Sequence, residues 1–161
     1  MGKKDKKRPT EDGRKTVATN RRARHNYHIL DVYQAGLVLV GTEVKSLRAG
    51  QVSLVDAYAD VLNGEMYLLN CHIPVYSHGT AWNHSPTRPR KVLLHRREID
   101  RLAGRIQQRG FTLVPLSIYF QGGVAKVDLA LARGKKQYDK REEIKKRDLD
   151  REMERAASSR Y

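Results

Sequence analysis

The sequence predicts a mainly β fold with short helices, a small antiparallel OB-like barrel with a basic disordered tail at each end. Three observations support this. Short alternating apolar segments are typical of strands, glycine-containing turns separate them, and basic charge is concentrated at both ends of the chain. We therefore expect a disordered leader over residues 1–24, a barrel over 25–133 and a tail over 134–161. A flat α+β sandwich is the structural alternative.

The first part of the barrel is expected to contain two strands and a helix. Residues 27–32 and 37–40 are rich in Val, Ile, Leu and Tyr, which favours strands, and Gly36 between them favours a bend. A short helix is expected over residues 42–50, because Thr42 can cap its start and a glycine ends it.

A β-hairpin over residues 56–70 is the clearest local prediction. Apolar and polar residues alternate on both sides of Asn63 and Gly64, a pair that readily adopts the positive φ of a tight turn. Residues 77–90 are polar and contain prolines, so they predict a long surface loop.

One more helix and a second hairpin complete the expected barrel. Apolar residues recur at helical spacing between residues 95 and 109, which predicts an amphipathic helix with arginines on its other face. Residues 111–120 and 124–132 flank a glycine-rich turn and are expected to pair. About six strands with two helices between them favour a closed or partly closed barrel.

Basic charge is distributed unevenly along the chain. The net charge is +14; residues 1–25 hold ten basic and three acidic residues, residues 133–161 hold eleven and seven, and the middle holds eleven and eight. More than half of the excess therefore lies at the ends, which favours an extended polyphosphate partner, that is, nucleic acid. A charge run that only improves solubility is the simpler alternative.

The tail after residue 134 carries acid-then-base pairs at helical spacing. Glu142 with Lys146, and Glu143 with Arg147, would each add only ~0.2 to 0.5 kcal/mol to a helix. That is too little to offset the cost of helix nucleation without packing. We expect the tail to be disordered in the free protein and helical when docked in a phosphate-lined channel.

The chain offers no clear set of residues for catalysis or metal binding. Its histidines lack compact ligand spacing and are expected in loops and at the surface, and its acids are not paired as a nuclease would need. Cys71, the single cysteine, is expected to be a small buried apolar residue. We therefore expect a non-enzyme without metal or cofactor. An RNA-modifying enzyme is a further alternative. The histidines are His25, His28, His72, His78, His84 and His95.

Cysteine content and hydropathy indicate the compartment. One cysteine excludes an intrachain disulfide and favours a reducing environment. No apolar run approaches the ~20 residues that span a bilayer, and the basic residues 1–8 lack the apolar block of a signal peptide. A cytoplasmic protein without membrane contact is expected.

The strongest binding motif is the basic segment over residues 20–27, Asn-Arg-Arg-Ala-Arg-His-Asn-Tyr. An arginine guanidinium can bind phosphate through two parallel hydrogen bonds or stack on a base, and His25 and Tyr27 add flat faces for unstacked nucleotides. A recognition helix of the kind that reads duplex DNA is not evident, so structured RNA is favoured.

Several segments together carry a family resemblance. They are residues 20–27, 35–36, 41–50, 90–95, 113–116 and 132–141, in shared order and spacing. The set resembles the small protein B (SmpB) family, bacterial RNA-binding proteins of ribosome rescue. The resemblance implies an OB-like barrel that binds the tRNA-like domain of tmRNA (SsrA RNA) and brings it to stalled ribosomes in trans-translation. It also implies partnership with alanyl-tRNA synthetase and elongation factor Tu through the tmRNA complex. A small basic structural protein of the ribosome is the rival interpretation.

The resemblance also implies site residues. One set would line the RNA-binding surface. In this set Glu43 would accept a hydrogen bond from a base or a ribose hydroxyl, or hold a neighbouring arginine in place. A second set, in the tail, would enter the empty mRNA path and contact the rRNA of the small subunit. Gln34 stands where many members have Glu, so a hydrogen bond rather than an ionic role is expected there. The first set is Asn20, Arg21, Arg22, Arg24, His25, Glu43, Lys45, Arg48, Lys91 and Lys126. The second is Gly134, Lys135, Lys136, Tyr138, Asp139, Lys140 and Arg141.

Overall fold

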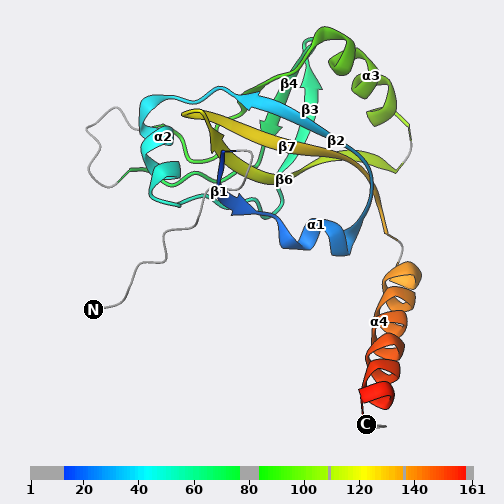
Figure 1. The fold of residues 1–161 in the computed structure, drawn as a ribbon. Coiled ribbons are helices and arrows are strands. Elements are labelled where there is room, and N and C mark those ends of the chain that lie inside the picture. Colours follow the sequence, from blue (N-terminus) through cyan, green and yellow to red (C-terminus); the bar gives the residue numbers. More distant parts are fainter. Residues whose placement is uncertain (1–12, 77–83, 109, 136, 159–161) are drawn as a thin grey trace, which may run out of the picture.

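The structure is a computed structural model that describes residues 13–76, 84–108, 110–135 and 137–158. Seven strands and four helices follow one another in this part of the chain (Figure 1). They are β1 (Arg14–Thr19), α1 (Arg21–Asn26), β2 (Tyr27–Leu37), α2 (Gly41–Arg48), β3 (Tyr58–Leu62), β4 (Glu65–Leu69), β5 (Arg90–Leu93), α3 (Arg96–Ile106), β6 (Phe111–Gln121), β7 (Val124–Gly134) and α4 (Gln137–Ser158).

The strands form one antiparallel sheet that closes on itself. Its order is β1-β6-β3-β4-β5-β2-β7, and a further pairing joins β6 to β7. Six strands therefore make a ring, and β1 lies beside the second half of β6. The closure is narrowest between β3 and β6, which share the single pair Ala59–Leu113, as in partly open OB-like barrels. The predicted antiparallel OB-like barrel is confirmed.

The second half of strand β7 is buried on both of its faces. Val127, Leu129 and Leu131 point into the barrel core, each at most 1% exposed. Ala130 and Ala132 face outwards on the same strand yet are also fully buried, because α1 covers them. Small side chains at these two positions let the helix approach the sheet closely.

The predicted leader is too long. Residues 14–24 were expected to be disordered, but they form β1 and most of α1. The strand is stabilised by pairing with β6, whose residues come late in the chain, so its local sequence shows little of a strand pattern. The rest of the predicted leader, residues 1–12, lies outside the described residues.

Other boundaries also differ from expectation. β2 is one continuous strand over Tyr27–Leu37, so the strand expected over residues 37–40 is wrong. β5 begins at Arg90, the last residue of the predicted loop 77–90; residues 77–83 lie outside the described part. The two hairpins and the helices expected over residues 42–50 and 95–109 are present.

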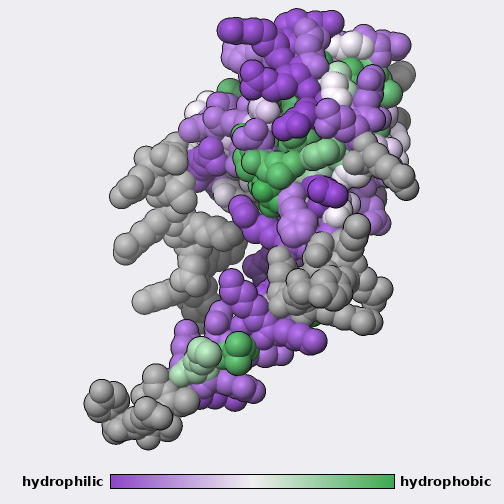
Figure 2. Space-filling view, turned by 90° about the vertical axis from the view of Figure 1, so that its right-hand side faces the viewer, coloured by the Kyte–Doolittle hydropathy of each residue, from purple (hydrophilic) through white to green (hydrophobic). Residues whose placement is uncertain are grey.

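The tail forms a single helix, α4, which is the conformation that the sequence predicts for it when it is docked. The segment lacks Gly and Pro and is rich in good helix formers. In Figure 1 it extends away from the barrel, and residues 144–155 are all exposed. Figure 2 shows it as mostly hydrophilic surface interrupted by a small apolar area. None of the described helices combines the length and the apolar character needed to span a bilayer.

Candidate nucleic-acid interface

Helix α1 displays four basic side chains on the outside of the barrel. Of its six residues only Ala23 is buried, at 2% exposure, where it packs on Val114, Ala130 and Ala132. The remaining side chains must therefore point outwards. The exposed basic ones are Arg21, Arg22, Arg24 and His25.

Asn20 positions this helix. Its backbone N–H donates to the Leu116 carbonyl at 2.7 Å, and its side-chain amide donates to the Pro115 carbonyl at 3.0 Å. Both acceptors belong to β6, so the start of α1 is fixed to the barrel wall. The sequence predicts an RNA contact for Asn20, whereas in the structure its amide nitrogen holds the helix.

The end of β7 fixes the other end of α1. Tyr27 pairs with Gly134, and the next residue, Lys135, donates its N–H to the Asn26 carbonyl at 2.9 Å. The Lys135 ammonium also donates to the Arg24 carbonyl at 3.0 Å. A cation at the carbonyl end of a helix is electrostatically favourable. Residues 134–135, the root of the tail, therefore lie next to α1, the arginine helix, although the two are far apart in the sequence.

A pocket of about 430 Å³ lies beside α1, between it and strands β1, β6 and β7. Arg21 and Arg24 line it, together with Thr16 and Thr19. Asp128 also lines it, and its carboxylate is paired with Arg14. Guanidinium and hydroxyl donors around one hollow suit a phosphate oxygen.

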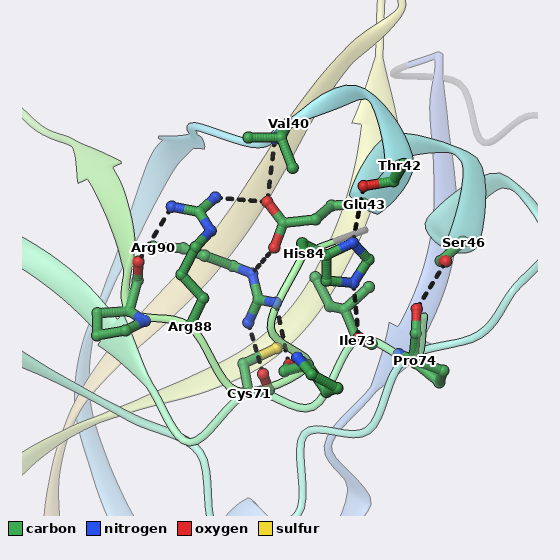
Figure 3. A network of polar contacts seen from close by, with 12 residues as sticks. Val40, Thr42, Glu43, Ser46, Cys71, Ile73, Pro74, His84, Arg88 and Arg90 are labelled. Atoms are coloured by element: carbon green, nitrogen blue, oxygen red, sulfur yellow. Dashed lines mark hydrogen bonds and ion pairs between the residues drawn. The ribbon is translucent and has the colours of Figure 1, made fainter. Parts of the chain in front are cut away.

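Glu43 does not lie on the surface, which corrects the position expected for it. Its carboxylate, on α2, is fully buried and forms ion pairs with Arg88 and with the equally buried Arg90. It also accepts the Val40 N–H at 3.0 Å, which caps the start of α2 (Figure 3). Of the two roles considered for Glu43, the structure supports that of holding neighbouring arginines.

Arg90 completes this network from β5. Its two terminal nitrogens donate to the Cys71 carbonyl at 2.6 Å and the Pro86 carbonyl at 3.0 Å. A fully buried guanidinium is tolerable only with such partners. The network therefore ties α2 to the segments before β5. Arg90 was not singled out as a site residue from the sequence, because it stands between Arg88 and Lys91 and resembles one more residue of a basic surface segment.

The network affects the acidity of its members. Burial alone would raise the pKa of Glu43, but the Val40 N–H and the two arginines outweigh it, so this pKa lies below its ordinary value of 4.5. Burial raises the pKa of the Cys71 thiol to about 11. Cys71 is thus a protonated, fully buried side chain, as the sequence predicts.

His84 is a buried residue rather than the surface histidine that the sequence predicts. Its Nε2 donates to the Ile73 carbonyl at 2.9 Å, and its Nδ1 lies 2.8 Å from the Thr42 hydroxyl (Figure 3). Ser46 donates to the Pro74 carbonyl at 2.8 Å. Two side chains of α2, Thr42 and Ser46, therefore hold the chain between β4 and β5, and Thr42 does so through His84.

Lys45 and Arg48 leave α2 on its exposed side, and no ion pair engages either of them within the described residues. Arg48 lies 5.9 Å from the centre of the Phe120 ring, and Lys45 lies 5.6 Å from that of Tyr76. Both distances are within cation–π range. α2 thus carries a second, smaller group of cations.

Gln34 and Lys126 meet on the outer face of the sheet. The Gln34 amide donates to the Tyr119 hydroxyl at 2.6 Å and to Gln121 at 3.1 Å, and Lys126 donates to the same Gln121 oxygen at 3.3 Å. Gln34 thus forms hydrogen bonds within the protein, on the outer face of the sheet. On β5, Lys91 lies 3.5 Å from Glu65, an exposed pair.

The structure therefore divides the predicted site residues. The arginines of α1 and the root of the tail lie together, whereas α2 lies at the far end of β2 (Figure 1). Gly134 ends β7, and residues 138–141 lie within α4, but Lys136 is outside the described residues. In the described ranges no group of three or more His, Cys, Asp or Glu could hold a metal ion.

Comparison with known proteins identifies the family. The sequence model of the SmpB protein family matches residues 17–159, nearly the whole chain. The chain belongs to the SmpB family. The SsrA-binding protein of Thermobifida fusca (strain YX) is 62% identical, with 94% of each chain covered. That of Nocardia farcinica (strain IFM 10152) is 63% identical over 90% of this chain and 91% of its own.

A solved structure also resembles this chain. It is described as "tmRNA-SmpB: a journey to the center of the bacterial ribosome", and its matching chain is 55% identical. The TM-score is 0.64, over 74% of this chain and 85% of that one. The predicted family resemblance is thereby confirmed at the level of sequence and fold.

The buried network leads to a prediction about pH. Glu43→Gln removes one charge from a buried pair, so we expect it to lower the free energy of unfolding by about 3 kcal/mol at neutral pH. Because the folded-state pKa of Glu43 is depressed, its contribution is complete above 4.5 and is lost as pH falls through the lower folded-state value. Urea unfolding of both proteins from pH 7 to pH 3 measures this.

Glu65→Gln is the matched control. Glu65 and its partner Lys91 are both about 40% exposed, so this pair should contribute less than about 1 kcal/mol. If Glu43→Gln and Glu65→Gln cost the same, or if the Glu43→Gln cost is constant down to pH 3, the buried network does not stabilise the fold in this way.

Proposed function

We propose that this chain binds the tRNA-like domain of tmRNA and delivers it to stalled ribosomes in trans-translation. Its membership in the SmpB family supports this, as do relatives named SsrA-binding proteins and a solved relative described with tmRNA and the bacterial ribosome. The same findings favour this function over that of a structural ribosomal protein. The proposed action is binding in the cytoplasm, without catalysis or cofactor.

The observation that carries the proposal is the display of arginines on α1. Arg21, Arg22 and Arg24 are exposed on a helix that is fixed to the barrel at both ends. None of the three has an ion-pair partner within the described part of the chain. Unpaired guanidinium groups on a rigid support suit the phosphates of a folded RNA.

The other proposed RNA contacts surround this helix or lie on the sheet and α2. We assign direct contacts to exposed or half-exposed side chains, and positioning roles to Asn20 and Glu43. The proposed contact residues are Arg21, Arg22, Arg24, His25, Tyr27, Lys45, Arg48, Lys91 and Lys126.

The tail is proposed to occupy the empty mRNA path of the small ribosomal subunit. Its helix α4 has an exposed surface throughout residues 144–155, so packing against the barrel does not stabilise it there. Contacts with rRNA phosphates would supply the missing stabilisation. The tail residues proposed for this role are Lys136, Tyr138, Asp139, Lys140 and Arg141. Alanyl-tRNA synthetase and elongation factor Tu are proposed to meet the chain only through the tmRNA complex.

Replacement of the α1 arginines should weaken RNA binding. For Arg22→Ala or Arg24→Ala we expect a several-fold decrease in affinity for the tRNA-like domain. The slope of log affinity against log salt should become shallower by about 0.7 to 0.9 for each phosphate that the variant no longer neutralises. Filter binding from 50 to 300 mM salt measures both. Arg97→Ala, an exposed arginine of α3, is the control. An equally large decrease for Arg97→Ala would contradict the assignment to α1.

Removal of the tail should separate two activities. Truncation after Lys135 keeps the hydrogen bonds of this residue to α1, so affinity for the tRNA-like domain should change less than about twofold. Peptide tagging on stalled ribosomes should be abolished in a reconstituted translation assay. Truncation after Arg133 also removes Lys135 and should weaken RNA binding further. Normal tagging by the protein that ends at Lys135 would overturn the proposed role of the tail.

A further inference from the structure

A second pocket lies on the other side of α1 from the one described above. It has a volume of about 360 Å³ and lies between α1, the turn that precedes β3, and β6. Arg22, Tyr27, Asp56 and Tyr58 are among its lining residues. The pocket thus shares Arg22 and Tyr27 with the proposed RNA-binding surface, but it adds an acid and a second aromatic ring.

Asp56 is an unusual residue for such a place. It is exposed, adopts a φ of 62°, and sits in the turn before β3. Arg22 lines the same pocket, yet no ion pair joins the two, and within the described residues the Asp56 carboxylate has neither a hydrogen-bond nor an ion-pair partner. An acid and a base therefore face one hollow without neutralising each other.

The two tyrosines add flat surfaces to the same hollow. Tyr27 is half-buried at the start of β2, and Tyr58 is 37% exposed at the start of β3. Unstacked RNA bases are commonly held by stacking on aromatic rings and by hydrogen bonds to their Watson–Crick edges. A phosphate-binding cation, aromatic rings and an acceptor group together match the phosphate, the base face and the base edge of one nucleotide.

The acceptor group selects among the bases. A carboxylate only accepts hydrogen bonds, and its two oxygens can take two parallel donors. Guanine presents such a pair on its Watson–Crick edge, N1–H beside the N2 amino group. Adenine and cytosine each present one amino group there, and uracil one imino group. The pocket chemistry therefore favours guanine.

We propose that this pocket binds one unstacked guanine of the RNA held on α1. The Asp56 carboxylate accepts from guanine N1–H and N2–H, Tyr27 and Tyr58 contact the base, and Arg22 binds its phosphate. This inference rests on the proposed function, because it needs an RNA on α1. It adds a base-specific contact to a surface on which most of the other proposed contacts are phosphate-binding cations.

Replacement of Asp56 by a neutral residue tests the proposal, because electrostatic repulsion and hydrogen bonding predict opposite changes in RNA affinity. A carboxylate on a basic RNA-binding surface repels phosphate, so its removal should tighten binding unless it accepts hydrogen bonds from the RNA. For Asp56→Asn we expect the opposite, a loss of about tenfold in affinity for the tRNA-like domain with an unchanged salt slope. Asn tolerates positive φ as well as Asp does, so the fold should be retained; an unchanged Tm checks this.

Asp31→Asn is the matched control, since Asp31 is an exposed acid on β2 outside the pocket lining. It should leave affinity unchanged or raise it slightly. Equal or tighter RNA binding by Asp56→Asn would overturn the inference while leaving the proposed function intact. If the wild-type protein did not bind the tRNA-like domain at all, both would fail.

The identity of the base is tested with inosine, which lacks the N2 amino group. Unpaired guanosines of the tRNA-like domain are replaced by inosine one at a time. At one position, the replacement should lower the affinity of the wild-type protein by up to about tenfold. The same replacement should lower the affinity of Asp56→Asn only slightly, because the amino group and the carboxylate belong to one interaction. Wild-type affinity that is insensitive to every replacement would overturn guanine recognition.

Discussion

Strand β7 is hydrogen-bonded along nearly its whole length to β2 on one side and β6 on the other. This double pairing closes the barrel, and it also places the two basic segments of the chain. β2 begins where β7 ends, so Tyr27 lies opposite Gly134. The arginine helix that enters β2 and the tail that leaves β7 therefore start from the same point. The pairing of β2 with β7 thus links the proposed RNA-binding surface to the tail that is proposed to enter the mRNA path.

A second anchor lies at the other end of β2. There the buried Glu43 carboxylate joins α2 to Arg88 and Arg90, and His84 and Ser46 hold the neighbouring chain. Buried ion pairs contribute modestly to stability as a whole, yet losing one partner is costly because the other charge stays buried. The network is therefore best understood as fixing geometry. It holds α2 so that Lys45 and Arg48 face outwards.

Much of the fold could be predicted because its signals are local. The β3–β4 hairpin follows from Asn63 and Gly64 in its turn, and α3 follows from apolar spacing. β1 and β5 were missed because their partners are remote in the chain, so pairing stabilises them more than their own composition does. The arginines of α1 were found by composition alone. The burial of Glu43 was not, since its arginine partners lie 45 and 47 residues away.

Hydrogen exchange at the root of the tail tests the central claim most directly. The Lys135 N–H donates to the Asn26 carbonyl, so opening this bond requires α1 to separate from the end of β7. We predict that in the free protein the Lys135 amide is strongly protected, as the amides of β7 are, whereas the amides of residues 144–155 exchange close to the rate of an unstructured chain. Exchange of the Lys135 amide as fast as that of the tail would show that α1 and the tail are not held together.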